Sequence, residues 1–219
     1  MDFGFAGARP VSMESQSRDS GFRLSVFVLG GLVVLMWALE IIDCLFLHQS
    51  LDRYGVQPRR LVGLRGIVFA PFLHAGFRHL GANTVPLIVL GGMILARRLS
   101  DFVVVTVVAA VIGGLGVWLF GRSHTVHIGA SGLIFGYFGF LLTCAVLERS
   151  ARSIAAAVAV ILLYGGLIWG LRPFQGQVSW LGHVFGLLGG VEAAHWLARR
   201  KRAATRGGQG SGAPLTWPT

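Results

Sequence analysis

Charged residues are scarce in this chain of 219 residues. Only 13% of its residues are charged, whereas about a quarter are charged in a typical soluble domain, and 54% are hydrophobic. The apolar residues come in long blocks rather than in alternation, which argues against a soluble fold and predicts a polytopic membrane protein. We therefore expect an all-α bundle of membrane-spanning helices that forms a single domain.

Cysteine is also nearly absent. The two cysteines, Cys44 and Cys144, both lie in apolar blocks and neither belongs to a C-x-x-C motif, so the sequence indicates no metal centre and no redox pair. They fall toward opposite faces of the expected bundle, and we expect no disulfide between them. No motif calls for a cofactor, and no pattern typical of a cleavable signal peptide is present.

Positive charge, in contrast, is in excess. The formal net charge is +10, with a single lysine, so almost all of the positive charge is arginine. In a soluble protein this balance would suggest a nucleic-acid partner. No alternation of aromatic and basic residues marks such a surface, and in a membrane protein arginines gather in loops that stay in the cytoplasm. We expect a lipid bilayer around the chain and no nucleic acid bound to it.

Six apolar blocks have about the length needed to cross ~30 Å of hydrocarbon. They are Leu24–Phe46, His79–Ala96, Phe102–Phe120, Ser131–Leu147, Ile154–Leu171 and Trp180–Leu197. Residues 47–78 are too broken by glycine and proline to form a span. The sequence thus predicts a membrane domain over residues 23–198 between two disordered cytoplasmic tails, 1–22 and 199–219.

An even number of spans places both termini on one side of the membrane. The termini and the loops after spans two and four carry twelve of the lysines and arginines, and the other side carries seven. This bias predicts that both termini are cytoplasmic.

Three polar residues open three of the spans at a similar depth. His79 begins the second span, Ser131 begins the fourth, and His183 lies just inside the sixth, while Asn83 follows His79 by one helical turn. Polar side chains inside a membrane usually point into the bundle or into a water-filled cavity. We expect these residues to converge near the outer face.

The residue types at this depth fit nucleophilic catalysis. A serine hydroxyl needs a nearby base to accept its proton, and histidine can act as that base near neutral pH. The oxyanion of a tetrahedral intermediate requires donors, which the Asn83 amide and the free Ser131 backbone N–H can provide. Gly129 and Gly132 would let a substrate backbone approach the serine closely.

Four motifs together resemble the rhomboid family of intramembrane serine proteases, in its bacterial six-helix form. They are APFLHAGFRH (Ala70–His79), HLGAN (His79–Asn83), GASG (Gly129–Gly132) and GHVFG (Gly182–Gly186). They occur in the order that the family uses, and the resemblance covers residues 24–198.

The resemblance implies a serine endopeptidase of the inner (plasma) membrane. Ser131 would be the nucleophile and His183 the general base, with His79, Asn83 and the Ser131 N–H as the oxyanion hole. Gly186 would support the site by packing. The substrates would be transmembrane segments of other membrane proteins, cut near the outer face beside small and helix-weakening residues.

The sequence departs from the family pattern at two places. A Trp-Arg pair is common in the first outer loop, but here the matching stretch is Leu64-Arg65-Gly66. A tyrosine often stacks on the catalytic histidine, and here that position is Phe135, whose ring can still stack. Tyr137 is expected to face another side of the helix. No carboxylate stands at a spacing that would complete a triad.

Several residues have structural interpretations. Gly132 and Gly136 are expected to pack span four against Gly186 and Gly190 of span six. His74 is expected to be a structural hydrogen-bonding residue. His124 and His127 are expected to be solvated loop residues rather than metal ligands. Glu40 and Asp43 are expected to pair with Arg65 or a neighbouring arginine. The loop Arg172–Ser179 is rich in Pro and Gly, as mobile lids are.

Two other functions stay open at this point. The first is a catalytically inactive rhomboid-like protein that binds transmembrane clients. The second is a small transporter, for which Glu192 would be the candidate polar group at greater depth. The oligomeric state is open as well.

Overall fold

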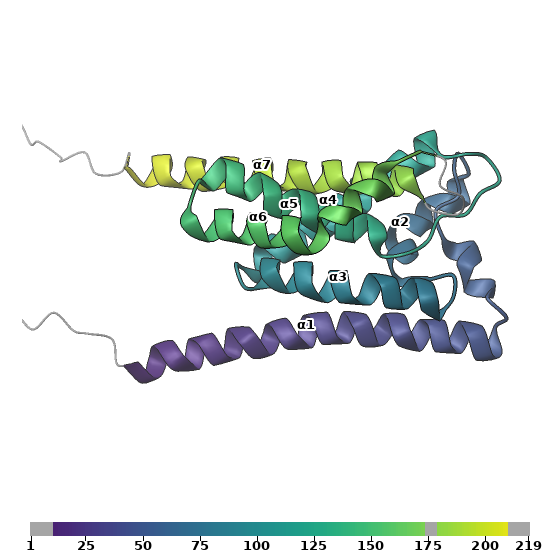
Figure 1. Cartoon of the computed structure of the whole chain (residues 1–219), viewed down its shortest axis with the longest axis horizontal. Coiled ribbons are helices and arrows are strands. Elements are labelled where there is room, and N and C mark those ends of the chain that lie inside the picture. The colour runs from purple at the N-terminus through teal and green to yellow at the C-terminus, as the bar shows by residue number, and fades with distance from the viewer. Residues whose placement is uncertain (1–10, 174–178, 210–219) are drawn as a thin grey trace, which may run out of the picture.

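The fold is a bundle of long helices, seen in a computed structural model (Figure 1). It describes residues 11–173 and 179–209, and the side chains of residues 23–173 and 179–205. The elements are α1 (Val11–Phe46), η1 (Ser50–Tyr54), η2 (Leu61–Arg65), α2 (Gly66–Phe69), η3 (Ala70–Phe72), α3 (Phe77–Leu95), α4 (Leu99–Phe120), α5 (Ser131–Glu148), α6 (Ala151–Tyr164), η4 (Gly165–Leu171) and α7 (Trp180–Gln209). Within these residues the strand-like pairing is the isolated bridge between Val56 and His127.

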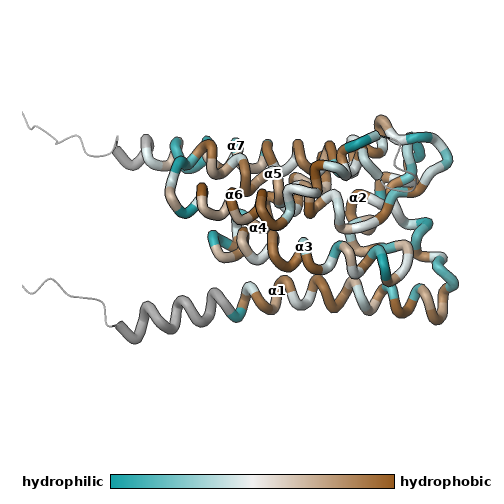
Figure 2. Tube along the Cα trace, in the orientation of Figure 1, coloured by the Kyte–Doolittle hydropathy of each residue, from teal (hydrophilic) through white to brown (hydrophobic). Residues whose placement is uncertain are grey.

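The membrane-protein prediction is confirmed. Five segments of the described chain are long and apolar enough to cross a membrane: 23–46, 77–95, 99–120, 131–148 and 151–171. Large apolar side chains such as Phe27 and Leu162 point outward and are more than three-quarters exposed, as expected for a surface in contact with lipid. Figure 2 shows apolar residues along the middle of the helices and polar residues gathered mainly at the two ends.

Helix α7 corresponds to the sixth predicted span. Its mean hydropathy is lower because it carries several glycines and polar residues, and it packs chiefly on α4 and α5. In Figure 1, α1 lies along α3 at the edge of the bundle, and the ends of α1 and α7 that lead to the termini are at the same end of the molecule. The short elements of residues 47–76 lie at the opposite end.

Two boundaries differ from those predicted. Residues 11–22 and 199–209, which we expected to belong to disordered tails, continue α1 and α7 as helix. The remaining parts of the predicted tails, residues 1–10 and 210–219, lie outside the described residues, as do residues 174–178 of the predicted lid.

Glycines bring α5 and α7 into direct backbone contact. A Cβ added at Gly186 would overlap the carbonyl of Gly132, and a Cβ added at Gly190 would overlap the carbonyl of Gly136. The same face of α7 passes close to α4, where Gly113 lies against the backbone of Gly186. The predicted glycine packing of the fourth and sixth spans is therefore present, and it requires small residues because any larger side chain would separate the helices.

We predict that Gly190→Ala destabilises the protein. The added methyl group meets the Gly136 carbonyl, and overpacking of this kind usually costs about 1–3 kcal/mol. Thermal unfolding in detergent should show a midpoint several degrees lower than that of the wild type. The matched control is Gly31→Ala on α1, where a Cβ meets nothing within 4 Å. Equal midpoints for the two variants would contradict the contact.

Candidate active site

Ser131 and His183 meet where α5 and α7 begin. Ser131 is the first residue of α5, and His183 lies in the first turn of α7. The serine Oγ lies 2.9 Å from Nε2 of the histidine, and the histidine is buried. This distance is within the range that proton transfer requires. The glycine contact between the two helices sets it, since Gly132 directly follows the serine and lies against Gly182.

The backbone carbonyl of Gly170 fixes the tautomer of His183. The Nδ1 atom lies 2.8 Å from this oxygen, which comes from η4. A carbonyl oxygen can only accept a hydrogen bond, so Nδ1 must carry the proton and Nε2 is left to accept from the Ser131 hydroxyl. Sequence reasoning missed this partner, because a backbone carbonyl is present at every position and gives no signal in the residue types.

Gly170 is a glycine for a steric reason. A Cβ at this position would lie 2.9 Å from Cζ of Phe135 and 3.1 Å from Nδ1 of His183. Any larger residue would therefore push on the imidazole or on the ring behind it.

Phe135 stacks on the imidazole of His183. The ring centroids are 4.1 Å apart and the planes differ by 8°. The ring thus holds the histidine in plane without the hydroxyl of a tyrosine. Tyr137 faces α4 instead, where its hydroxyl lies 2.8 Å from Thr106 Oγ1, as its spacing predicted.

The three expected oxyanion donors are only partly free. The Ser131 backbone N–H makes no hydrogen bond to another described residue. The Asn83 side chain is buried and donates one N–H to the carbonyl of His79, at 2.9 Å, so one of its two amide hydrogens is already used. His79 accepts the Ala75 N–H at Nδ1, at 3.3 Å, which leaves its Nε2–H as a donor.

Gly129 lets the His79 ring approach the serine loop. Its φ is +112°, a region that favours glycine, and its N–H donates to the carbonyl of Ala70. A Cβ at Gly129 would lie 2.7–2.8 Å from two atoms of the His79 ring. The side chain of His79 therefore packs directly on the loop that leads into Ser131.

His74 also supports the loop that leads into Ser131. It is buried, and its Nε2 accepts the Ala130 N–H at 3.3 Å, next to the serine. Burial and the neighbouring His79 ring lower the pKa of His74 to about 4, so it stays neutral and can accept this bond at physiological pH. This agrees with the structural role expected for it.

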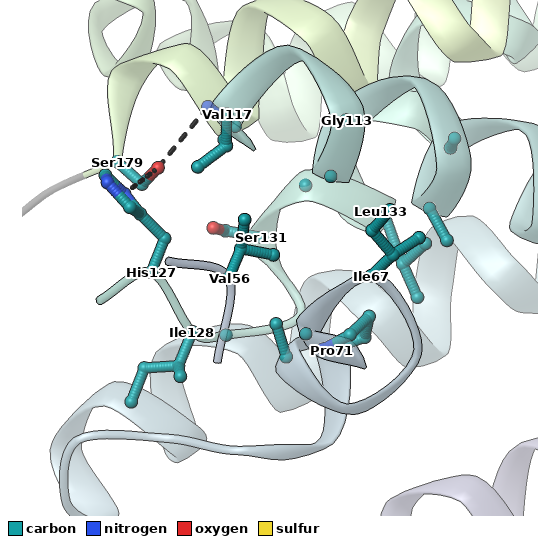
Figure 3. A pocket seen from close by; sticks show the side chains of 18 residues that line it. Val56, Ile67, Pro71, Gly113, Val117, His127, Ile128, Ser131, Leu133 and Ser179 are labelled. Carbon is teal, nitrogen blue, oxygen red and sulfur yellow. Dashed lines mark hydrogen bonds between the residues drawn. The ribbon is translucent and has the colours of Figure 1, made fainter. Parts of the chain in front are cut away.

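A small cavity of about 60 Å³ opens beside Ser131 (Figure 3). Its lining comes from residues 47–76, which are predicted to form the first outer loop, from α4 and from the loop before α5, and includes Ile67, Val117 and His127. A cavity of this size can admit several water molecules. Figure 3 shows Ser131 and Ser179 on its wall.

The first outer loop is anchored without the family's tryptophan. The Arg65 guanidinium lies 4.2 Å from the centroid of the Tyr54 ring, a cation–π contact, and Tyr54 packs edge-on against Phe69. The Trp118 indole also donates to the carbonyl of Arg60, at 2.8 Å, which ties the loop to α4.

Two expectations for other polar residues need correction. Among the described side chains, Glu40 and Asp43 form no ion pair with Arg65; the Asp43 carboxylate instead accepts the Leu51 N–H at 2.9 Å. His127 is not a solvated residue, because both of its ring nitrogens are hydrogen-bonded. Glu192, the candidate polar group of the transporter alternative, is exposed on the outside of α7, and this position does not favour that alternative.

Comparisons with known proteins agree with this architecture. The Rhomboid domain matches residues 62–200. The uncharacterized protein Rv1337 of Mycobacterium tuberculosis is 43% identical over 204 residues, which cover 86% of this chain and 85% of that protein. The uncharacterized protein ML1171 of Mycobacterium leprae is 40% identical over 201 residues, 84% of this chain and 79% of that protein. The rhomboid protease GluP of Bacillus subtilis is 32% identical over 178 residues, 78% of this chain but 34% of GluP.

The helical bundle and its apolar exterior define a polytopic membrane protein in which a partly buried serine contacts a buried histidine. The chain belongs to the rhomboid family, as its motifs predicted.

We predict that His74 makes stability depend on pH. The unfolded chain takes up a proton at His74 near pH 6.5, whereas the folded chain does so only near pH 4. The contribution of neutral His74 to the free energy of unfolding is therefore fully present above pH 6.5. It falls by at most about 3 kcal/mol as the pH drops to 4. Thermal unfolding between pH 7 and 4 should show a steeper loss for the wild type than for His74→Gln.

Asp52 acts in the opposite direction and serves as an internal reference. Burial and Asp43 raise its pKa to about 6, so the folded chain takes up this proton first and gains stability as the pH falls from 6 to about 4. The wild type and His74→Gln both carry Asp52, so the difference between their stability–pH profiles reports the effect of His74 alone. Identical profiles for the wild type and His74→Gln would contradict the assignment.

Proposed function

We propose that this protein is an intramembrane serine endopeptidase, a hydrolase that cuts transmembrane segments of other membrane proteins near the outer face. The observation that carries the proposal is the 2.9 Å contact between Ser131 Oγ and His183 Nε2, with the tautomer of the histidine fixed from the other side by Gly170. The family membership and the likeness to a protein named as a rhomboid protease support it.

In the first half of the reaction, Ser131 Oγ attacks the carbonyl carbon of the scissile peptide bond. Its proton passes to Nε2 of His183, which becomes an imidazolium that still donates to the Gly170 carbonyl. The oxyanion of the tetrahedral intermediate accepts hydrogen bonds from the Ser131 N–H, the second amide hydrogen of Asn83 and the Nε2–H of His79. The C–N bond then breaks, and His183 gives its proton to the leaving amine.

In the second half, the acyl group is an ester of Ser131. A water molecule loses a proton to His183 and attacks the ester carbon, and the same donors hold the second oxyanion. The serine Oγ leaves and takes the proton back. The cavity beside Ser131 gives this water a place close to the reacting carbon. No cofactor takes part in these steps.

The surroundings of the site fit a membrane-embedded substrate. The described helices present apolar side chains to the outside, so a substrate helix would approach from the lipid. A helical peptide bond is shielded by its own backbone, and the substrate must unwind locally before attack. The relatives named above are bacterial, which supports the plasma membrane of a bacterium as the location. The excess of basic residues on the side of the termini supports an orientation with both termini cytoplasmic.

We predict that Ser131→Ala and His183→Ala abolish cleavage. Purified protein in proteoliposomes would be mixed with a labelled single-span substrate that contains small and helix-weakening residues near its outer end. Removal of either group should lower the rate by at least about 10³-fold. The matched histidine control is His195→Ala, because His195 bonds to the Val191 carbonyl of its own helix, away from the site.

Two outcomes would contradict the proposal. The first is cleavage by Ser131→Ala at the wild-type rate. The second is equal binding of the substrate to the wild type and to Ser131→Ala with cleavage by neither, which would favour an inactive protein that binds transmembrane clients.

A further inference from the structure

A second serine–histidine pair lies beside the first. His127 Nδ1 is 2.8 Å from Ser179 Oγ, and both residues line the same cavity as Ser131 (Figure 3). His127 precedes Ser131 by four residues and Ser179 precedes His183 by four residues. The two pairs therefore join the same two segments of the chain at matching positions, with the residue types exchanged.

The hydrogens of this second pair have a defined direction. Thr125 donates its hydroxyl to the carbonyl of Arg122, at 2.6 Å, so Thr125 Oγ1 accepts from His127 Nε2, at 2.9 Å. The proton of the neutral imidazole is then on Nε2, and Nδ1 accepts the Ser179 hydroxyl. Burial lowers the pKa of His127, which favours this neutral form.

His127 is a fixed point. Its backbone N–H and carbonyl both pair with Val56 of the first outer loop, at 3.0 and 2.9 Å, and Val56 is buried. With the backbone held by this bridge and the ring held by Thr125, the position of Nδ1 is set independently of α7.

Ser179 links the fixed imidazole of His127 to the start of α7. Its Oγ accepts the Gly182 N–H at 3.4 Å, and its carbonyl accepts the N–H of His183 at 3.2 Å. These are the first bonds of the helix that bears the histidine of the site, and a cap of this kind fixes where the helix starts. A shift of Ser179 would move the first turn of α7 and the imidazole with it.

We propose that His127 is a positioning residue of the active site, which acts through Ser179. The pair fixes the first turn of α7 at the depth where His183 reaches Ser131. The glycine contacts set the separation of α5 and α7, and this hydrogen bond sets their register along the membrane normal. The kinetic consequence of this inference rests on the proposed protease function. The geometry of the bond is independent of that function.

The test is a double-mutant cycle in the proteoliposome cleavage assay. His127→Phe and Ser179→Ala should each lower kcat by about 10–100-fold and change KM by less than about 3-fold. The double variant should be no slower than the slower single variant, because each change breaks the same bond between His127 and Ser179. His127→Asn and Ser179→Thr, which keep an acceptor and a hydroxyl, should recover most of the wild-type kcat.

Hydrogen exchange supplies a readout that needs no activity. Amides in the first turns of α7 should exchange faster in His127→Phe than in the wild type and in His127→Asn. If the wild type cleaves nothing but this difference appears, the protease function fails and the positioning contact stands. Losses of kcat that multiply in the double variant would overturn the inference, and so would unchanged exchange together with unchanged kcat. Cleavage that survives in Ser131→Ala but vanishes when Ser179→Ala is added would also overturn it.

Discussion

The direct backbone contact of α5 with α7 is the constraint on which the rest of the structure depends. Lipid provides little hydrophobic drive for helices to associate, so close approach must come from small residues, and here glycines of each helix face carbonyls of the other. Because Ser131 and His183 both stand at the start of these helices, the same contact brings a hydroxyl and an imidazole together in an apolar setting. The same contact thus packs the two helices and places the two reactive side chains. A side chain added there would disturb both.

The site obtains its polarity from neutral groups rather than from charges. A carboxylate behind the histidine would be an unpaired charge near the membrane, which is expensive to bury. The backbone carbonyl of Gly170 orients the imidazole of His183 instead, and an aromatic ring stacked on the imidazole holds its plane. His74 supports the serine loop in its neutral form for the same reason. The loop that leads into Ser131 is tied to the first outer loop through the bridge of Val56 with His127.

Much of this architecture could be predicted from the sequence, because hydrophobic length identifies spans directly and motif order places polar residues at helix starts. The depth shared by Ser131 and His183 and the packing role of Gly186 follow from helical geometry. The carbonyl of Gly170 could not be predicted, since every residue has one. Tyr54 in place of the missing tryptophan, and the bond of His127 to Ser179, depend on loop conformation, which the pattern of residues does not specify. The equal spacing of the two serine–histidine pairs was the available signal. The helical extensions of α1 and α7 were missed because their polar composition is also that of a disordered tail.

The central claim is that Ser131 is a nucleophile activated by His183. The most direct measurement is covalent labelling by a fluorophosphonate, in which the serine oxygen bonds to phosphorus and fluoride leaves, followed by intact-mass analysis and peptide mapping. The account predicts one adduct on the folded wild type, located at Ser131, and no adduct on His183→Ala or Ser131→Ala. Equal labelling of the wild type and Ser131→Ala, or a folded wild type that is never labelled, would contradict it.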